Sequence, residues 1–426
     1  MAGPDRFSLL PPEVIVSILS RLPLKDAVRT SVLARSWHHL WTFRSRLSLG
    51  WPGDPLGNTG NSGPVASSWI ERVHHVVSSL RGPLLHFALC EHFSYDQSAL
   101  LQRLLDLLLQ KEGCLDTLHL SIISDSLVIH LPSFHSLKRL ALSECRIVLP
   151  TGFQGFQRLS TLSLQSVQIS NDDLNFLIHT SNNLTGFQGI NFVASEDHPL
   201  SVKLSLPLLR YLEFGINNSV EKVEVISAPC LEQASILNYT YSDSEKFASV
   251  TLGFLTTAVM VSSLELSFNV LKSLSLAALP SNFTFPQVRL LKLSMKIRAM
   301  DKRMYDAFIW LLWGMPFLKT LNIQLGDHSI DANRNGILMR KLLLKKHDGL
   351  SCLDQTLECV RRLDTENLNH FMTGMTPGKF FLLNARVLKL MKVAYRTGSG
   401  VEPRMIEELQ KAKLFLLESI IGVELM

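Results

Sequence analysis

The chain has 426 residues, of which 46% are apolar and 19% are charged, so it can bury a large core and is not intrinsically disordered. Its formal net charge is +5, and residues 1–49 carry most of this excess, with seven Lys and Arg against three Asp and Glu. No apolar run reaches the ~18–20 residues that span a bilayer, and the opening MAGPDRF lacks the apolar stretch of a secretory signal. We therefore expect a protein of the nucleus and/or cytoplasm with no membrane partner.

The cysteines and histidines do not indicate a metal site. The six cysteines are scattered and none forms a CxxC pair, which argues against both a disulfide scaffold and a zinc site. His74 and His75 are adjacent, and adjacent residues on a helix face different ways. We expect free thiols in a reducing compartment, no metal and no other cofactor.

The first forty-odd residues predict three short helices. Pro11 and Pro12 favour a helix start, and Pro23 ends that helix. A second helix is predicted from Lys25 to Leu33, with Asp26 placed favourably in its first turn. The first helix has an apolar face at i, i+3, i+4 and i+7, and the third has a face at similar spacing. These two faces consist of Ile15, Ile18, Leu19 and Leu22, and of Ala34, Trp37, His38 and Trp41.

A helical module of this size does not stabilise itself easily. Domains below about 40 residues usually need a metal, a disulfide or a partner, and this segment has no cysteine. Its apolar faces must therefore complete their burial against the rest of the chain or against another protein. We place the module at residues 5–49. Residues 50–68 hold five glycines and three prolines and predict a linker.

The region after the linker begins with a helix and then repeats a leucine pattern. Residues 69–77 predict the helix, and residues 84–89 predict the first buried strand. From residue 115 the unit L-x-x-L-x-L recurs, its first six copies starting 22, 22, 25, 25 and 22 residues apart. This period of 20–29 is typical of leucine-rich repeats. The units are Leu115-Leu118-Leu120, Leu137-Leu140-Leu142, Leu159-Leu162-Leu164, Leu184-Phe187, Leu209-Leu212-Phe214, Leu231-Ile236, Val261-Leu264-Leu266, Leu271-Leu274-Leu276, Val288-Leu291-Leu293, Leu318-Leu321-Ile323 and Ala385-Leu388-Leu390.

These repeats predict an α/β solenoid with a parallel sheet on its concave side. The leucines of x-L-x-L point to one side of a strand, and the next unit covers them. Helices are predicted at residues 172–178 and 305–312. The starts at 261 and 271 are only ten residues apart, so one of them is not a true repeat. We place the repeats at residues 69–325 and an irregular end at 326–426, with irregular helix and loop over 325–384 and a capping helix at 405–417.

The N-terminal residues resemble the plant F-box motif. The match runs through Leu10-Pro11, Glu13-Val14, Ile18-Leu19, Leu22-Pro23, Lys25-Asp26, Arg29 to Leu33, Trp37 and Leu40-Trp41, with Ser36 departing from it. Together with the irregular repeats and a segment at 379–391 that looks like an FBD-type C-terminal segment, this resembles plant F-box/LRR proteins. The resemblance implies binding to a Skp-type adaptor and a cullin in an SCF ubiquitin ligase. The adaptor-binding residues that it implies are Leu10, Pro11, Ile15, Ile18, Leu19, Leu22, Pro23, Val28, Leu33 and Trp37.

The sequence predicts a receptor rather than an enzyme. It has no Gly-rich phosphate loop, no HExxH and no GxSxG, so we expect no catalytic residues. An LRR scaffold without a ligase role and a small-molecule-gated LRR sensor remain as alternatives. The basic residues of the module favour an acidic protein partner over nucleic acid. An unknown target protein would contact the outward strand positions, for instance His119, Arg139, Ala141, Ser163, Glu213, Glu265, Ser275 and Lys292.

Overall fold

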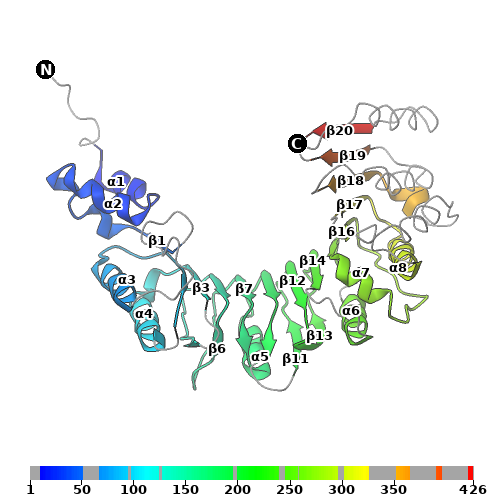
Figure 1. Ribbon diagram of the computed structural model, residues 1–426, viewed down its shortest axis with the longest axis horizontal. Helices are drawn as coiled ribbons and strands as arrows, with labels where there is room; N and C mark the ends of the chain where they lie inside the picture. The colour runs from blue at the N-terminus through cyan, green and yellow to red at the C-terminus, as the bar shows by residue number, and fades with distance from the viewer. Residues whose placement is uncertain are drawn as a thin grey trace. The chain divides into compact units, whose positions relative to one another are not determined.

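The computed structural model describes residues 10–50, 67–94, 97–123, 127–194, 199–238, 245–257, 259–295, 302–325, 352–364, 390–395 and 421–425. The chain divides into two compact units, residues 1–209 (unit 1) and 210–426 (unit 2). Each unit combines a parallel sheet with helices, as Figure 1 shows, so the predicted mixed α/β class with repeats behind an N-terminal helical module is confirmed.

The N-terminal module contains two α-helices, α1 (Pro12–Leu19) and α2 (Leu24–Arg29). The prediction of a third α-helix was wrong, because the chain continues as short 3₁₀ turns at Thr30–Val32, Arg35–Trp37 and Leu40–Phe43. Ala34 is extended, with φ −153° and ψ 152°, and therefore interrupts the helical path. Short 3₁₀ pieces of this kind are common as connectors.

The core of the module is small and lies between these elements. Ile15, Leu19, Ala27 and Trp37 are buried together. Other apolar side chains pack against this cluster, namely Leu10, Leu22, Ala34, Leu40 and Trp41. The predicted faces are therefore only partly internal, since Ile18 is 42% exposed and His38 is exposed.

The module runs directly into the sheet of unit 1. Residues Arg46–Leu49 form β1, which pairs in parallel with β2 (His86–His92), so that Leu47 lies opposite Phe87. The strand predicted at 84–89 is thus the second of the sheet, and β1 was missed because four residues give too short an alternation. Backbone hydrogen bonds from Arg81 to Thr42 (2.8 Å) fasten the two segments together.

Unit 1 builds its sheet from one strand per repeat. Leu118, Leu140, Leu162 and Phe187 lie opposite one another on neighbouring strands and are buried, which is the ladder that the repeat pattern predicts. The strands run in the order β1, β2, β3 (Thr117–Ile123), β5 (Arg139–Ser143), β7 (Thr161–Gln165) and β9 (Gly186–Ile190). A second parallel sheet contains β4 (Val128–His130), β6 (Arg146–Val148), β8 (Gln168–Ile169) and β10 (Val193–Ala194).

Helices α3 (Ser67–Ser79), α4 (Ser98–Gln110) and α5 (Asn171–His179) accompany this sheet. The helices predicted at 69–77 and 172–178 are confirmed. Ser170 caps α5 by accepting a hydrogen bond from the Asp173 amide at 3.0 Å, a favoured start for a helix. A 3₁₀ turn, Glu112–Cys114, follows α4, and β11 (Leu200–Ser205) closes the unit.

Unit 2 continues the same pattern with less regular spacing. Its sheet runs β12 (Tyr211–Ile216), β14 (Gln233–Asn238), β15 (Ser263–Leu266), β16 (Leu290–Met295), β17 (Thr320–Leu325), β18 (Cys359–Asp364), β19 (Leu390–Tyr395) and β20 (Ile421–Leu425). The remaining elements are β13 (Val220–Ser227), α6 (Glu245–Thr257), α7 (Phe268–Leu274), α8 (Lys302–Trp313) and a π-helical turn, Cys352–Thr356.

Unit 2 contains one of the predicted elements and differs from the prediction at two other places. The helix predicted at 305–312 is confirmed as α8. The leucines at 271–276, predicted as a strand, lie largely in α7, which explains the short spacing from the strand unit at 261. The prediction of only irregular helix and loop over 325–384 was wrong at β18. The segments at 379–389 and 405–417 lie outside the described residues.

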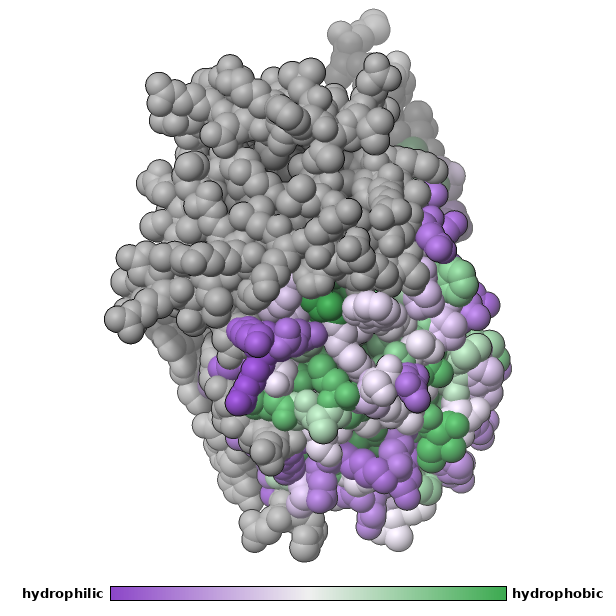
Figure 2. Space-filling model, turned by 90° about the vertical axis from the view of Figure 1, so that its right-hand side faces the viewer, coloured by the Kyte–Doolittle hydropathy of each residue, from purple (hydrophilic) through white to green (hydrophobic). Residues whose placement is uncertain are grey.

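The surface of unit 2 mixes apolar and polar residues. Figure 2 shows apolar side chains interspersed with polar ones on the described part of the face that it displays. Met260, Trp313 and Phe317 are exposed by 59%, 54% and 49%. Within the residues that the structure describes, no helix has the length and apolar character needed to cross a membrane.

Candidate protein-binding surfaces

The N-terminal module exposes several large apolar side chains. We define the exposed apolar set as Val14, Ile18, Val28, Val32 and Leu33, whose exposed fractions are 42%, 42%, 39%, 87% and 69%. Val14 and Ile18, one turn apart on α1, line a shallow groove of about 330 Å³ with Glu13, Ser17 and Arg21. Because contiguous exposed apolar side chains often mark a protein-interaction surface, the groove with Val14 and Ile18 is a candidate for one.

The structure divides the ten predicted adaptor-binding residues into two groups. Core residues hold the module together, and surface residues are available to a partner. The core or partly buried group is Leu10, Ile15, Leu19, Leu22 and Trp37. The exposed group is Pro11, Ile18, Pro23, Val28 and Leu33. Sequence reasoning missed Val14 and Val32, although the i, i+4 spacing of Val14 and Ile18 was a signal for a second apolar stripe on α1.

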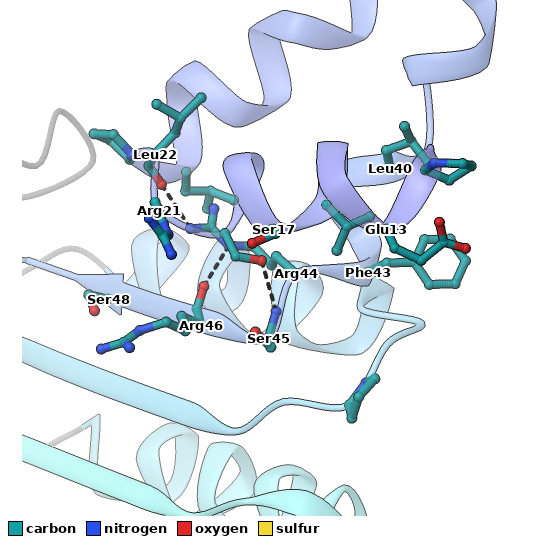
Figure 3. A pocket seen from close by; sticks show the side chains of 16 residues that line it. Glu13, Ser17, Arg21, Leu22, Leu40, Phe43, Arg44, Ser45, Arg46 and Ser48 are labelled. Carbon is teal, nitrogen blue, oxygen red and sulfur yellow. Dashed lines mark hydrogen bonds between the residues drawn. The ribbon is translucent and has the colours of Figure 1, made fainter. Parts of the chain in front are cut away.

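A large, open pocket lies where the module meets the sheet. It has a volume of about 1300 Å³ and is lined by α1, the turn after it, β1 and Pro83. Arg44 lies in its wall and is only 3% exposed, with Nε donating to the Arg46 carbonyl at 2.6 Å. Figure 3 shows Arg21 and Arg46 at one end of the pocket near Ser48, and Glu13 and Phe43 at the other end.

The outward positions of the unit 1 strands form its strand-lined face. His119, Ala141 and Ser163 share one row, because they lie opposite one another on β3, β5 and β7. Arg139 precedes Ala141 by two residues and donates from Nε to the Thr117 hydroxyl at 3.0 Å. The four predicted target-contacting residues of this unit are thus on one face, as expected from strand alternation. Their role in binding stays a prediction.

Two histidines on this face have lowered pKa values. Burial is the main cause of the lowered pKa of His86, and the nearby charges of Arg46, Arg139 and His119 lower that pKa further. Burial also lowers the pKa of His119. Both imidazoles are therefore mostly neutral near pH 7. The sequence prediction missed Arg46 and His86 because β1 was not recognised and β2 does not carry the repeat motif.

The strand-lined face of unit 2 is more acidic. Glu265 and Lys292 lie opposite each other on β15 and β16 and form an ion pair at 3.3 Å. Tyr211 donates a short hydrogen bond from its hydroxyl to Glu213. Burial, this hydrogen bond and the nearby carboxylates raise the pKa of Tyr211. Ser275 is not on this face, since it terminates α7, so its expected strand position was wrong.

The described residues bring together no group of three or more His, Cys, Asp or Glu that could hold a metal ion. The thiol of Cys145 is buried, and burial together with the charge of Glu144 raises its pKa to about 12. A thiol in this state is protonated near neutral pH and is a poor nucleophile.

Comparisons with known proteins agree with this arrangement. A model described as "F-box domain" matches residues 7–48, and one described as "FBD-associated F-box protein At5g56370, LRR repeats" matches residues 117–323. The F-box/FBD/LRR-repeat protein At1g13570 of Arabidopsis thaliana is 26% identical over 58% of this chain and 56% of its own length. The F-box/FBD/LRR-repeat protein At3g14710 of the same plant is 34% identical over 39% of this chain and 36% of its own length.

This chain therefore spans about half, or less, of the lengths of these two relatives. The FBD-like segment at 379–391 lies beyond both matched ranges and stays a prediction. The matched ranges themselves coincide with the helical module and with the strands β3 to β17. The chain is thus similar to F-box/LRR-repeat proteins, with an F-box match at its N-terminal module followed by a match to leucine-rich repeats of the FBD-associated type.

Proposed function

We propose that this chain is the substrate-recognition subunit of an SCF-type cullin ubiquitin ligase, acting in the nucleus and/or cytoplasm. The F-box binds a Skp-type adaptor, the adaptor connects the chain to the cullin, and the repeats bind the target protein. The observation that carries the proposal is an F-box match over a module whose α1, α2 and following turn expose the apolar set.

The physical role of such a subunit is proximity. Holding a target beside a charged ubiquitin carrier raises the effective concentration of the two reacting groups, and no residue of the receptor takes part in the bond making. The close hydrogen-bonded connection between the F-box and β1 supports this role, because a firm junction limits the positions that a bound target can occupy. The other subunits of the ligase supply the chemistry.

Adaptor capture by the full-length chain tests the proposal. We expect Ile18→Asp/Leu33→Asp to lower capture of a Skp-type adaptor by about 100-fold or more, because each apolar side chain buried is worth about 1.5–3 kcal/mol and a buried unpaired charge costs more. Ile18 and Leu33 are 42% and 69% exposed and lie outside the buried cluster of the module, so we expect the double variant to fold.

The matched control is Ile226→Asp, which places the same charge on an exposed isoleucine of β13 in unit 2. Capture should be unchanged in this variant. Absence of capture by the unmodified, folded chain would contradict the proposal and favour an LRR scaffold without a ligase role. If the Ile18→Asp/Leu33→Asp variant captured as much adaptor as the unmodified chain, the adaptor interface would not include these two residues of the exposed apolar set.

A further inference from the structure

We propose that the strand-lined face of unit 1 binds an acidic, extended segment of the target protein through Arg46, His86, His119 and Arg139, which we name the basic row. The inference rests on the proposed function, because it assigns the chemistry of the target that the receptor would take.

The basic row occupies four neighbouring strands of one sheet. Arg46 on β1 lies opposite His86 on β2. His86 in turn lies opposite Thr117 on β3, and Thr117 lies opposite Arg139 on β5. His119 is two residues beyond Thr117 and therefore points to the same side of β3. Neighbouring strands are about 4.8 Å apart, so the row extends across roughly 14 Å. The charges of Arg46, Arg139 and His119 all act on His86, which places the four groups within electrostatic reach of one another.

Acidic groups are missing from the outward positions of the described strands in this sheet of unit 1. Glu91 on β2 is turned inward and is only 7% exposed. Asp116, just before β3, is engaged by Lys138 in an ion pair at 3.0 Å. Glu144 follows the end of β5 and lies beyond the row. The described outward positions of this sheet thus supply no carboxylate to the basic row, whereas Lys292 of unit 2 has Glu265 on the neighbouring strand. Such a surface attracts an acidic partner.

The pocket at the F-box junction extends the basic surface. Figure 3 shows that Arg21, in the turn after α1, and Arg46 lie at the same end of this pocket. In the other direction, the row that holds His119 continues through Ser163, whose hydroxyl donates to Gln188 Oε1 at 2.6 Å. An extended ligand on the basic row would thus meet a cation at one end and hydroxyl and amide groups at the other.

The spacing of the row favours an acidic peptide segment over other anions. An extended chain advances about 3.3 Å per residue, so about five residues cover the row, with acidic side chains on alternate residues about 7 Å apart. A single phosphate contacts only part of such a row. The described outward positions of this sheet hold no Phe, Tyr or Trp, so the large aromatic platforms on which bases of single-stranded nucleic acids stack are missing from them.

The histidines give the proposed binding a definite pH dependence. The groups that act on His86 from the neighbouring strands are Arg46, His119 and Arg139, and all of them disfavour its protonation. Carboxylates of a bound segment would oppose this effect, so binding takes up protons at His86 and His119. Affinity for an acidic segment therefore rises as the pH falls from about 7.5 to about 6, provided that the carboxylates stay ionised.

The test uses the full-length chain and fluorescein-labelled dodecapeptides of alternating glutamate and serine, or of alternating glutamine and serine. We expect fluorescence anisotropy to show binding of the glutamate peptide that is at least about 10-fold tighter than that of the glutamine peptide and that weakens with salt. Arg46→Gln/Arg139→Gln should lower the affinity of the chain for the glutamate peptide by at least about 10-fold. The matched control is Arg103→Gln, since Arg103 is exposed on α4 and outside the sheet.

Two further measurements sharpen the test. The single variant Arg139→Gln changes an exposed side chain and should weaken binding even if the double variant is unstable. His86→Gln/His119→Gln should remove the gain in affinity at lower pH. Equal affinity for the two peptides, or unchanged binding by folded Arg139→Gln and Arg46→Gln/Arg139→Gln, overturns the inference.

Adaptor capture by the same preparations separates this inference from the proposed function. Captured adaptor with no preference for the glutamate peptide overturns the basic row as a docking site and leaves the receptor role in place. A preference for the glutamate peptide without any adaptor capture overturns the ligase role and supports acidic-segment binding by an LRR scaffold.

Discussion

Arg44 reaches back 22 residues along the chain and donates a hydrogen bond from Nη2 to the carbonyl oxygen of Leu22, at 2.9 Å. Its Nε donates to the carbonyl of Arg46, which is the first residue of β1. Nearby, the Ser45 amide donates to the Ser20 hydroxyl at 3.2 Å. One buried guanidinium thus connects the end of α1 to the first strand of the sheet, and the F-box and the repeats share a continuous structure at this point.

Arg44→Met should destabilise this junction. Methionine keeps much of the apolar stem but removes both donors, and it leaves two backbone carbonyls with fewer partners. We expect the free energy of unfolding to fall by about 2–4 kcal/mol, measured by urea denaturation of the full-length chain. Arg35→Met is the control, since Arg35 is exposed in a 3₁₀ turn. Equal urea midpoints for the two variants would argue against a structural role for Arg44.

Truncation of Leu19 should mainly lower the stability of the chain, whereas truncation of the adjacent Ile18 should mainly lower its affinity for the adaptor. Leu19 is 1% exposed and Ile18 is 42% exposed. Leu19→Ala should cost about 2–5 kcal/mol of stability, whereas Ile18→Ala should cost about 1 kcal/mol or less. Adaptor affinity measured on folded protein should fall mainly in Ile18→Ala. A large stability loss in Ile18→Ala would contradict the division between core and surface.

Gly50→Ala should weaken the pairing of β1 with β2. Gly50 follows β1 and has φ +79°, a conformation that favours glycine. A Cβ at this position would overlap the backbone carbonyl of Cys90 on β2. We expect a loss of about 1–3 kcal/mol and faster amide hydrogen exchange in β1. Gly152→Ala is an informative comparison, because it also has positive φ but open space around the added methyl group. Equal losses of stability in the two variants would show that the positive φ, and not the overlap with the Cys90 carbonyl, causes the cost.

The stability of unit 1 should decrease as the pH falls through the range in which histidine titrates. The pKa of His86 is lowered from the ordinary value of 6.5 in the folded state, so the unfolded chain binds more protons near that pH. This contribution is fully present above pH 6.5 and is lost as the pH falls toward the lowered value. The urea midpoint should therefore drop between pH 7.5 and pH 5.5. His86→Gln should reduce this drop, and an unchanged slope would show that His86 does not cause it.

The rate at which each cysteine of the folded chain reacts with iodoacetamide should depend on how far its thiol is buried. Cys114 and Cys230 are exposed, whereas Cys145 and Cys352 are buried. The raised pKa of Cys145, about 12, further suppresses the reactive thiolate. We expect iodoacetamide at pH 8 to modify Cys114 and Cys230 at least about 10-fold faster than Cys145, measured by mass spectrometry of peptides. All of these cysteines should react alike in urea. Rapid modification of Cys145 in the folded chain would contradict the placement of β5 and β6.

The leucine pattern was sufficient to predict the repeats because each unit carries its own signal. Leu118, Leu140 and Leu162 occur at a regular period and alternate with polar residues, so both their strand character and their shared buried face follow from the sequence. The helices α3, α5 and α8 were predicted for the same reason, since their apolar residues recur at helical spacing. β18 and β1 were missed because they lack the full motif and are strands only by pairing with a neighbour.

The F-box and the leucine-rich repeats could be recognised in the sequence, because local patterns of apolar residues specify those elements. The division of the F-box apolar residues into core and surface depends on how the module packs, since α2 ends at Arg29 and the turns after it place Leu33 outward and Trp37 inward. Only the pairing of β1 with β2 brought Arg46 beside His86, although the two are far apart in the sequence. Contacts between distant segments depend on packing and register, which no local pattern encodes.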